Sequence, residues 1–180
     1  MNSIKKYCDI VRTSSLENEI AIKLLYENKL HKKVIETLRE ELELYIRTFY
    51  LLNQSKFNRE ELLNKFFRAF KWGITEKVMV DFAKNNNNQG WEEITYKIGC
   101  YFIHLTVFHN YSNEDIIKFV NNNEKRILIN YINQYYNASL DIDSTFEDII
   151  KYSLSVFDKI KENMEYQLIQ LEKDIKETEK

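Results

Sequence analysis

The segment from Lys97 to His109 holds residue types that could do chemistry on RNA. Lys97 precedes His104 by two helical turns, which places both side chains on one helix face about 10 Å apart along the axis. A histidine that titrates near neutral pH can take a proton from a 2′-hydroxyl, and a nearby cation stabilises the negative charge that develops on phosphorus. The geometry therefore permits metal-free RNA cleavage, in which His104 would be the general acid and base, Lys97 the phosphate-binding cation and His109 an auxiliary group.

The sequence leaves two interpretations of these histidines open. His109 lies about 140° around an ideal helix from His104, so the two share a site only if the helix ends between them. Residues 110–113, Asn-Tyr-Ser-Asn, are typical of such an end. His104 also has large apolar neighbours, as a hydrogen-bonded core histidine would have. These neighbours are Tyr101, Phe102, Leu105 and Phe108.

A second candidate site alternates basic and aromatic residues. Lys65, Arg68, Lys71 and Trp72 recur at about three-residue spacing, so they could bind phosphates and stack on bases. We predict them as RNA-binding residues. In the alternative interpretation, the phenylalanines between them pack inward and the cations are solvated on the opposite side. These phenylalanines are Phe66, Phe67 and Phe70.

The chain lacks the patterns of nucleotide, zinc, di-iron and calcium sites. Its glycines, Gly73, Gly90 and Gly99, are too far apart to form a phosphate-binding loop. The two cysteines, Cys8 and Cys100, are too far apart in the chain to form a closely spaced zinc-binding pair, and no Glu-x-x-His pair occurs. The acidic residues at 141–143 are followed by Phe146 where a calcium loop requires glycine. We therefore expect neither a metal nor a cofactor.

The composition predicts an all-α protein. The 180 residues include no proline and three glycines, too few turn residues for a sandwich, barrel or βαβ fold, and 44% are hydrophobic.

The formal net charge is −2, so binding to nucleic acid requires a local basic patch. There is no signal-peptide or membrane-spanning run, and we expect no membrane contact. With Cys8 and Cys100 interpreted as reduced thiols, we expect a cytoplasmic protein.

Apolar residues at spacings of three and four predict one helical domain over residues 1–180, a bundle of five to seven helices. The first helix is predicted to begin at a capping box of Ser14 and Glu17 and to run to about Asn28. The most regular apolar stripe spans residues 34–52. Shorter helices are predicted over 58–70, from Thr75, over 91–108, from Ser112 and over 126–136.

The last predicted helix is long and begins at a second capping box, Ser144 and Glu147. Its apolar stripe runs from Phe157 to Ile175. Residues from about 172 to 180 are mostly charged, so this end either frays in solvent or pairs with a partner helix. The stripe predicts a homodimer, or a protein partner bound through the C-terminal helix.

These features resemble the HEPN superfamily, which are cytoplasmic all-α proteins of prokaryotic toxin and anti-phage systems. The likeness rests on a helical hairpin over residues 24–52, with the stretch LHKKVIETLRE from Leu30, and on a later helix with a basic-to-histidine motif before a turn. Active members carry Arg, a polar residue and then His, and they dimerise to form a metal-independent ribonuclease site. Here Lys97 takes the arginine position, Ile98 the polar position and His104 the histidine position. Lysine lacks the planar fork with which arginine binds phosphate.

We therefore expect a HEPN-like homodimer that binds or cleaves RNA without metal in a toxin or anti-phage setting. The alternative is a non-catalytic helical interaction protein whose partner surface is the Phe157–Ile175 stripe. A third interpretation is a bundle whose aromatic-rich interior encloses a small molecule.

Overall fold

The computed structural model describes residues 3–87, 93, 95–97, 99 and 115–178. Within these ranges all regular secondary structure is helical, which confirms the predicted all-α class. Residues 3–87 and 115–178 contain eight helical elements, one more than the upper limit of the prediction. They are α1 (Ser3–Glu27), α2 (His31–Leu52), α3 (Lys56–Phe67), α4 (Glu76–Asn87), the 3₁₀-helix η2 (Ile116–Phe119), α6 (Asn122–Tyr136), α7 (Phe146–Ile150) and α8 (Ser153–Thr178). None of the helices in the described part is long and apolar enough to cross a membrane.

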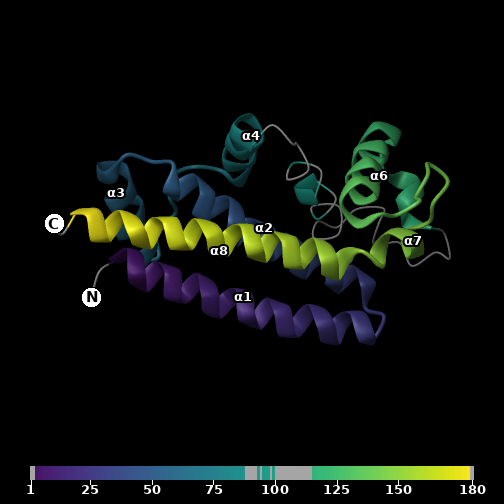
Figure 1. Ribbon diagram of the computed structural model, residues 1–180, viewed down its shortest axis with the longest axis horizontal. Coiled ribbons are helices and arrows are strands. Elements are labelled where there is room, and N and C mark those ends of the chain that lie inside the picture. Colours follow the sequence, from purple (N-terminus) through teal and green to yellow (C-terminus); the bar gives the residue numbers. More distant parts are fainter. Residues whose placement is uncertain (1–2, 88–92, 94, 98, 100–114, 179–180) are drawn as a thin grey trace.

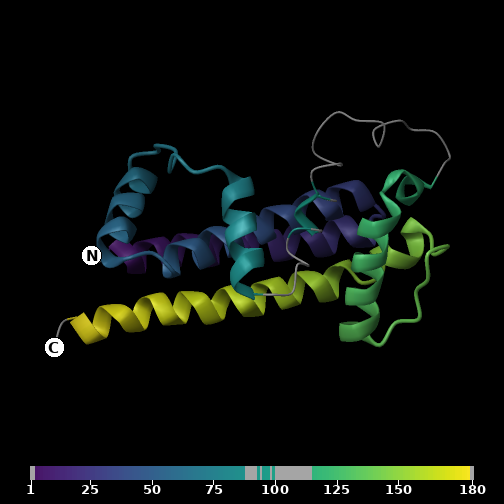
Figure 2. The ribbon, with the colours of Figure 1, turned by 90° about the horizontal axis from the view of Figure 1, so that it is seen from above.

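Three long helices, α1, α2 and α8, lie side by side and form the body of the molecule (Figure 1). α1 and α2 are antiparallel and are joined by a tight turn in which Lys29 has a left-handed backbone, with φ of 56°. α8 runs parallel to α2, so it ends beside the start of α1. In Figure 2, α3 lies at that end, α4 crosses the middle, and α6 and α7 lie at the opposite end.

The apolar stripe of α8 forms the centre of the core. Because α1 and α2 of the same chain cover its described apolar residues, these side chains are not exposed to a second copy or a partner helix in this structure, and the homodimer and the protein partner stay predictions. The charged end of α8 is also used within the chain, where Glu172 pairs with Arg12 and Asp174 with Arg59. The buried members of the stripe are Phe157, Ile160, Met164, Leu168 and Leu171.

α1 begins at Ser3, so the predicted start at Ser14 is wrong. The residues before Ser14 are helical because one face of them packs against the other long helices. The Tyr7 hydroxyl lies 3.3 Å from Thr48 Oγ1 of α2, and the Cys8 thiol lies 3.9 Å from a backbone carbonyl oxygen of α8. Packing of this face outweighs the local capping signal.

The opposite face of α1 carries an exposed apolar row, formed by Leu16, Ile20 and Leu24. Their side chains are 54%, 55% and 55% exposed, whereas Val11 and Ile22 on the inner face are buried. The row follows a four-residue spacing, so all three residues lie on one side of the helix. These residues contribute to the helical pattern in the sequence without belonging to the core.

The predicted capping box at Ser144 and Glu147 lies one residue away from the observed one. Thr145 Oγ1 accepts a hydrogen bond from the backbone N–H of Asp148, and the Asp148 carboxylate accepts one from the backbone N–H of Thr145. The Thr145 hydroxyl also donates to the Asp148 carboxylate at 2.6 Å, and this bond, followed by the one from the Thr145 backbone N–H, lowers the pKa of Asp148 to about 2. The box begins the short α7, and a turn at residues 151–152 separates α7 from the long C-terminal helix α8.

Candidate functional site

Lys97, the predicted phosphate-binding cation, joins an ion-pair network between α4, α6 and the residues around 95–97. Its Nζ lies 3.1 Å from Glu93 and 3.4 Å from Glu124 of α6, and Glu93 also pairs with Lys84 of α4 at 2.6 Å. The hydrogen bond with Glu93 is the main cause of the raised pKa of Lys97. The ammonium group is therefore charged, but two carboxylates already balance it. This arrangement favours a role in joining three segments over that of a free phosphate-binding cation.

His104 and His109 lie outside the described residues, as does Cys100. The assignment of His104 as general acid and base therefore stays a prediction. The described residues of the predicted 91–108 helix, which are 93, 95–97 and 99, are helical.

A polar cluster that the sequence analysis did not identify surrounds two arginines of α2. Arg39 donates a hydrogen bond of 2.5 Å to Glu76 of α4, and its guanidinium carbon lies 4.9 Å from the ring centroid of Tyr96. The Tyr96 hydroxyl donates to the same carboxylate at 3.1 Å. Glu43 pairs with Arg39 at 3.6 Å and with Arg47 at 2.7 Å. The i, i+4 spacing of Arg39, Glu43 and Arg47 was visible in the sequence, but the partners Glu76 and Tyr96 depend on the fold.

Gly99 lies buried against this cluster. A methyl group at position 99 would lie 2.7 Å from Cβ of Arg39, 2.8 Å from its Cγ and 2.9 Å from its Cδ. These distances are shorter than non-bonded carbon atoms allow. Glycine is therefore required for the segment around 95–99 to approach α2 this closely.

Trp72, predicted to stack on RNA bases, lies in the core. Its side chain is 5% exposed, its ring centroid lies 6.5 Å from that of Tyr50, and the Arg47 guanidinium carbon lies 5.8 Å from its ring centroid. A base from solvent cannot reach this ring. The assignment of Trp72 as an RNA-stacking residue is therefore wrong in this structure.

Phe70 is the exposed aromatic residue of this segment, with 64% of its surface accessible. α3 ends at a left-handed turn where Ala69 has φ of 57°, and the N–H of Phe70 donates back to the carbonyl of Lys65 at 2.9 Å. The neighbouring Arg68 and Lys71 are both exposed. The alternative interpretation, in which the phenylalanines pack inward, therefore fits Phe66 and Phe67, which are partly buried, but not Phe70.

A further cation, from α1, lies close to the end of α3. Lys6 Nζ lies 4.9 Å from the ring centroid of Phe67, the last residue of α3. We call Lys6, Arg68, Phe70 and Lys71 the basic–aromatic patch. Within the described ranges, no carboxylate forms an ion pair with any of its three cations. Lys65 lies at the edge of the patch and is paired with Glu61 at 2.6 Å.

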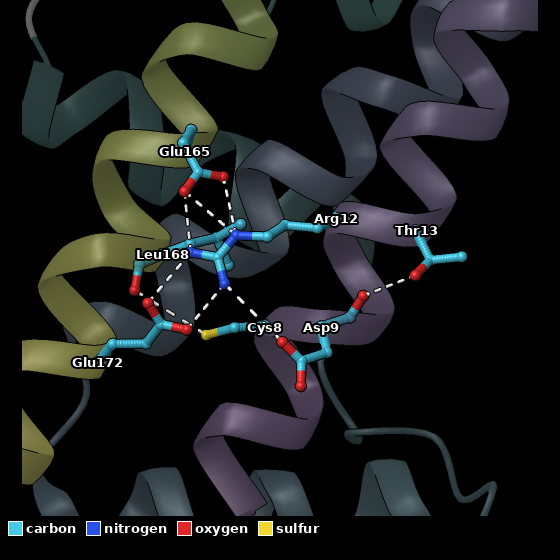
Figure 3. Close-up of polar contacts among 7 residues, drawn as sticks. All are labelled: Cys8, Asp9, Arg12, Thr13, Glu165, Leu168 and Glu172. Atoms are coloured by element: carbon cyan, nitrogen blue, oxygen red, sulfur yellow. Dashed lines mark hydrogen bonds and ion pairs between the residues drawn. The ribbon is translucent and has the colours of Figure 1, made fainter.

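Figure 3 shows the polar cluster that ties α1 to α8. The Arg12 guanidinium lies between two carboxylates of α8, with hydrogen bonds of 2.8, 3.0 and 3.1 Å to Glu165 and of 2.7 and 3.1 Å to Glu172. These bonds raise the pKa of Arg12. Burial, followed by the Glu172 charge, raises the pKa of the adjacent Cys8 thiol to about 12. Cys8 is therefore a protonated thiol at neutral pH, which is unfavourable for a nucleophile.

Glu41 of α2 is a fully buried carboxyl group, with 0% exposure. It accepts hydrogen bonds from Ser15 Oγ at 2.6 Å and from Asn18 Nδ2 at 3.0 Å, both from α1. Burial raises the pKa of Glu41, while these two hydrogen bonds and the charge of Lys161 act in the opposite direction. The Glu41 carboxyl group therefore links α2 to α1.

The chain was compared with known proteins. No family model matches it, and no curated protein and no solved structure matches it either.

Proposed function

We propose that this protein binds single-stranded RNA through the basic–aromatic patch. The observation that carries the proposal is the exposed ring of Phe70, with the exposed cations Arg68 two residues before it and Lys71 directly after it in the chain. Proteins that bind single strands combine cations along the backbone with aromatic rings on which bases stack. In a chain of net charge −2, such binding requires a local patch of this kind.

The charges of the patch give the expected strength of its salt dependence. Lys6, Arg68 and Lys71 provide three phosphate contacts. For single strands, log K falls with log salt by about 0.7 per contact, so the slope is about −2 and affinity falls roughly 20-fold between about 50 and 200 mM salt. Lys65 is expected to add little, because Glu61 already pairs with it.

The test is a titration of a fluorescently labelled, single-stranded RNA of mixed sequence with the full chain, followed by anisotropy. Phe70→Ala removes the stacking ring and is expected to weaken binding by about 1–3 kcal/mol, the usual contribution of one base–aromatic stack. Phe57→Ala is the matched control, because Phe57 is 75% exposed at the other end of α3. Equal affinity of the wild type and Phe70→Ala, or binding that does not depend on salt, would contradict the proposal.

RNA cleavage is a separate part of the proposal, for which the support is the HEPN-like spacing of Lys97 and His104. The same RNA is incubated in EDTA with the wild type, with His104→Ala and with Phe70→Ala, and products are resolved on a denaturing gel. We expect His104→Ala to bind RNA without cleaving it and Phe70→Ala to lose both properties. Cleavage by His104→Ala at the wild-type rate would remove the catalytic assignment and leave the binding proposal intact.

A further inference from the structure

A small, partly open cavity lies at the end of the bundle where α2, η2, α6, α7 and α8 meet. Its volume is about 50 Å³. Apolar side chains from all of these elements make up most of its wall. Those that the argument uses are Leu38 of α2, Leu128 and Ile132 of α6, Ile149 of α7 and Val156 of α8.

The wall of this cavity also holds a buried hydroxyl group that has no partner. Ser153, the first residue of α8, is 4% exposed and is one of the lining residues. Its Oγ finds no hydrogen-bond partner in the part of the chain that the structure describes. A buried hydroxyl without a partner costs free energy, and native structures rarely leave one unexplained. The cavity and the orphan hydroxyl are independent observations, and both point to an occupant.

Water fits this cavity poorly. A buried water usually makes about three hydrogen bonds, and apolar cavities that cannot supply them stay dry. Of the lining residues that carry a polar group, Tyr131 already pairs through its hydroxyl with Tyr136. Besides Ser153 and Tyr131, Thr95 and Tyr152 are the other lining residues with a hydroxyl group, and the rest of the wall is apolar. An occupant that is mainly apolar, with a single polar atom, matches the wall better than water does.

We propose that this cavity binds a small aliphatic molecule that carries one oxygen, an alcohol or a carbonyl compound, with the oxygen hydrogen-bonded to Ser153 Oγ. One water-sized group needs about 10–15 Å³ of such volume, so the cavity holds roughly three to five non-hydrogen atoms. Because all five elements line it, the occupant contacts the α6–α7 end and the α2–α8 core at the same time.

The test uses 1-propanol, which has four non-hydrogen atoms, as the probe. The full chain, with ¹³C-labelled methyl groups of Ile, Leu and Val, is titrated and followed by NMR. We expect saturable shifts at the methyl groups of Leu38, Leu128, Ile132, Ile149 and Val156. The best ligands of this size bind no tighter than roughly 40 µM, and we expect a dissociation constant on the order of 1 mM.

Ser153→Ala removes the hydroxyl with almost no change in volume, so we expect it to weaken propanol binding about three- to tenfold. Ser155→Ala, at an exposed position on the same helix, is the matched control and should bind as the wild type does. Xenon under pressure serves as a second, fully apolar probe, which should shift the same methyl groups equally in the wild type and in Ser153→Ala.

Three results would overturn the proposal. They are propanol shifts that do not saturate, equal propanol affinity of the wild type and Ser153→Ala, and a long-lived water at Ser153 that propanol does not displace. Xenon binding without propanol binding would also contradict the proposal, because it would show that the cavity accepts apolar atoms but no ligand with an oxygen.

Discussion

Replacing Gly99 by alanine sets two opposing effects against each other. Gly99 is helical, and alanine favours a helix over glycine by about 1 kcal/mol, so propensity alone predicts a more stable protein. The added methyl group, however, would lie 2.7 Å from Cβ of Arg39. That atom is fixed to the backbone of α2 and cannot rotate away, so the two segments must separate. Such overpacking costs about 1–3 kcal/mol.

Because three carbon atoms of Arg39 lie within 2.9 Å of the new methyl group, we expect the steric cost at the upper end of its range, about 2–3 kcal/mol. After the gain of about 1 kcal/mol in helix propensity, the net loss is about 1–2 kcal/mol. For a chain of this size the melting temperature should fall by about 2–8 °C. The assay is thermal and urea unfolding followed by circular dichroism. Separation of the segments should also weaken the Arg39–Glu76 and Arg39–Tyr96 contacts.

A double-mutant cycle with Arg39→Ala isolates the part of the contact that Cγ and Cδ of Arg39 make, while Cβ stays in place. Arg39→Ala removes Cγ and Cδ, so the cost of Gly99→Ala should be smaller in that background. Gly73→Ala is the control, because Gly73 has φ of 77° and a methyl group there meets no atom within 4 Å. Its cost comes from the left-handed backbone and should add to that of Arg39→Ala without coupling. A Gly99→Ala variant more stable than the wild type would refute the reasoning.

Three further predictions concern α1 and α2. Arg12→Ala leaves two carboxylates of α8 without their partner and should lower the free energy of unfolding by about 1–2 kcal/mol, a figure already discounted for partial exposure. Urea unfolding measures this loss, which should be smaller at high salt because salt screens the ion pairs. The pKa of Glu41 is raised in the folded state, so the folded protein holds the proton of this carboxyl group more tightly than the unfolded chain does. The protonated Glu41 therefore contributes fully to stability below about pH 4.3, and this contribution is lost as the pH rises through the folded pKa. Glu41→Gln should make the urea midpoint depend less on pH in this range. Ile20→Lys, on the exposed row of α1, should change stability by less than about 0.5 kcal/mol, and a larger loss on thermal unfolding would show that the row is covered.

The sequence predicts the elements of this fold better than their ends. The stripe over residues 34–52 defines α2 correctly, because a regular apolar period reflects burial on one face. The start of α1 was missed because Ser14 and Glu17 form a good local cap, while the signal against it, packing of Tyr7 and Cys8, comes from α2 and from α8, far away in the chain. Local sequence patterns carry no information about contacts between segments that are distant in the chain.

The candidate sites show the same limit. Trp72 and Phe70 are two residues apart, and no local rule tells which ring enters the core and which faces solvent. The left-handed turn at Ala69 determines which of the two rings faces solvent. Such turns are expected at glycine or asparagine rather than at alanine. Likewise, Glu93 could be recognised four residues before Lys97, but Glu124 and Lys84 meet this pair only in the folded molecule.

The packing of α8 against both α1 and α2 has a consequence for synthesis. The contact between the Cys8 thiol and the Leu168 carbonyl joins residues 160 positions apart, and at about 5–20 residues per second the ribosome needs roughly 8–32 s to make that stretch. During this time α1 and α2 can form a hairpin, but the apolar groove that α8 later fills stays open to water. The nascent chain is therefore expected to be a chaperone substrate and to aggregate if translation stalls before α8 emerges.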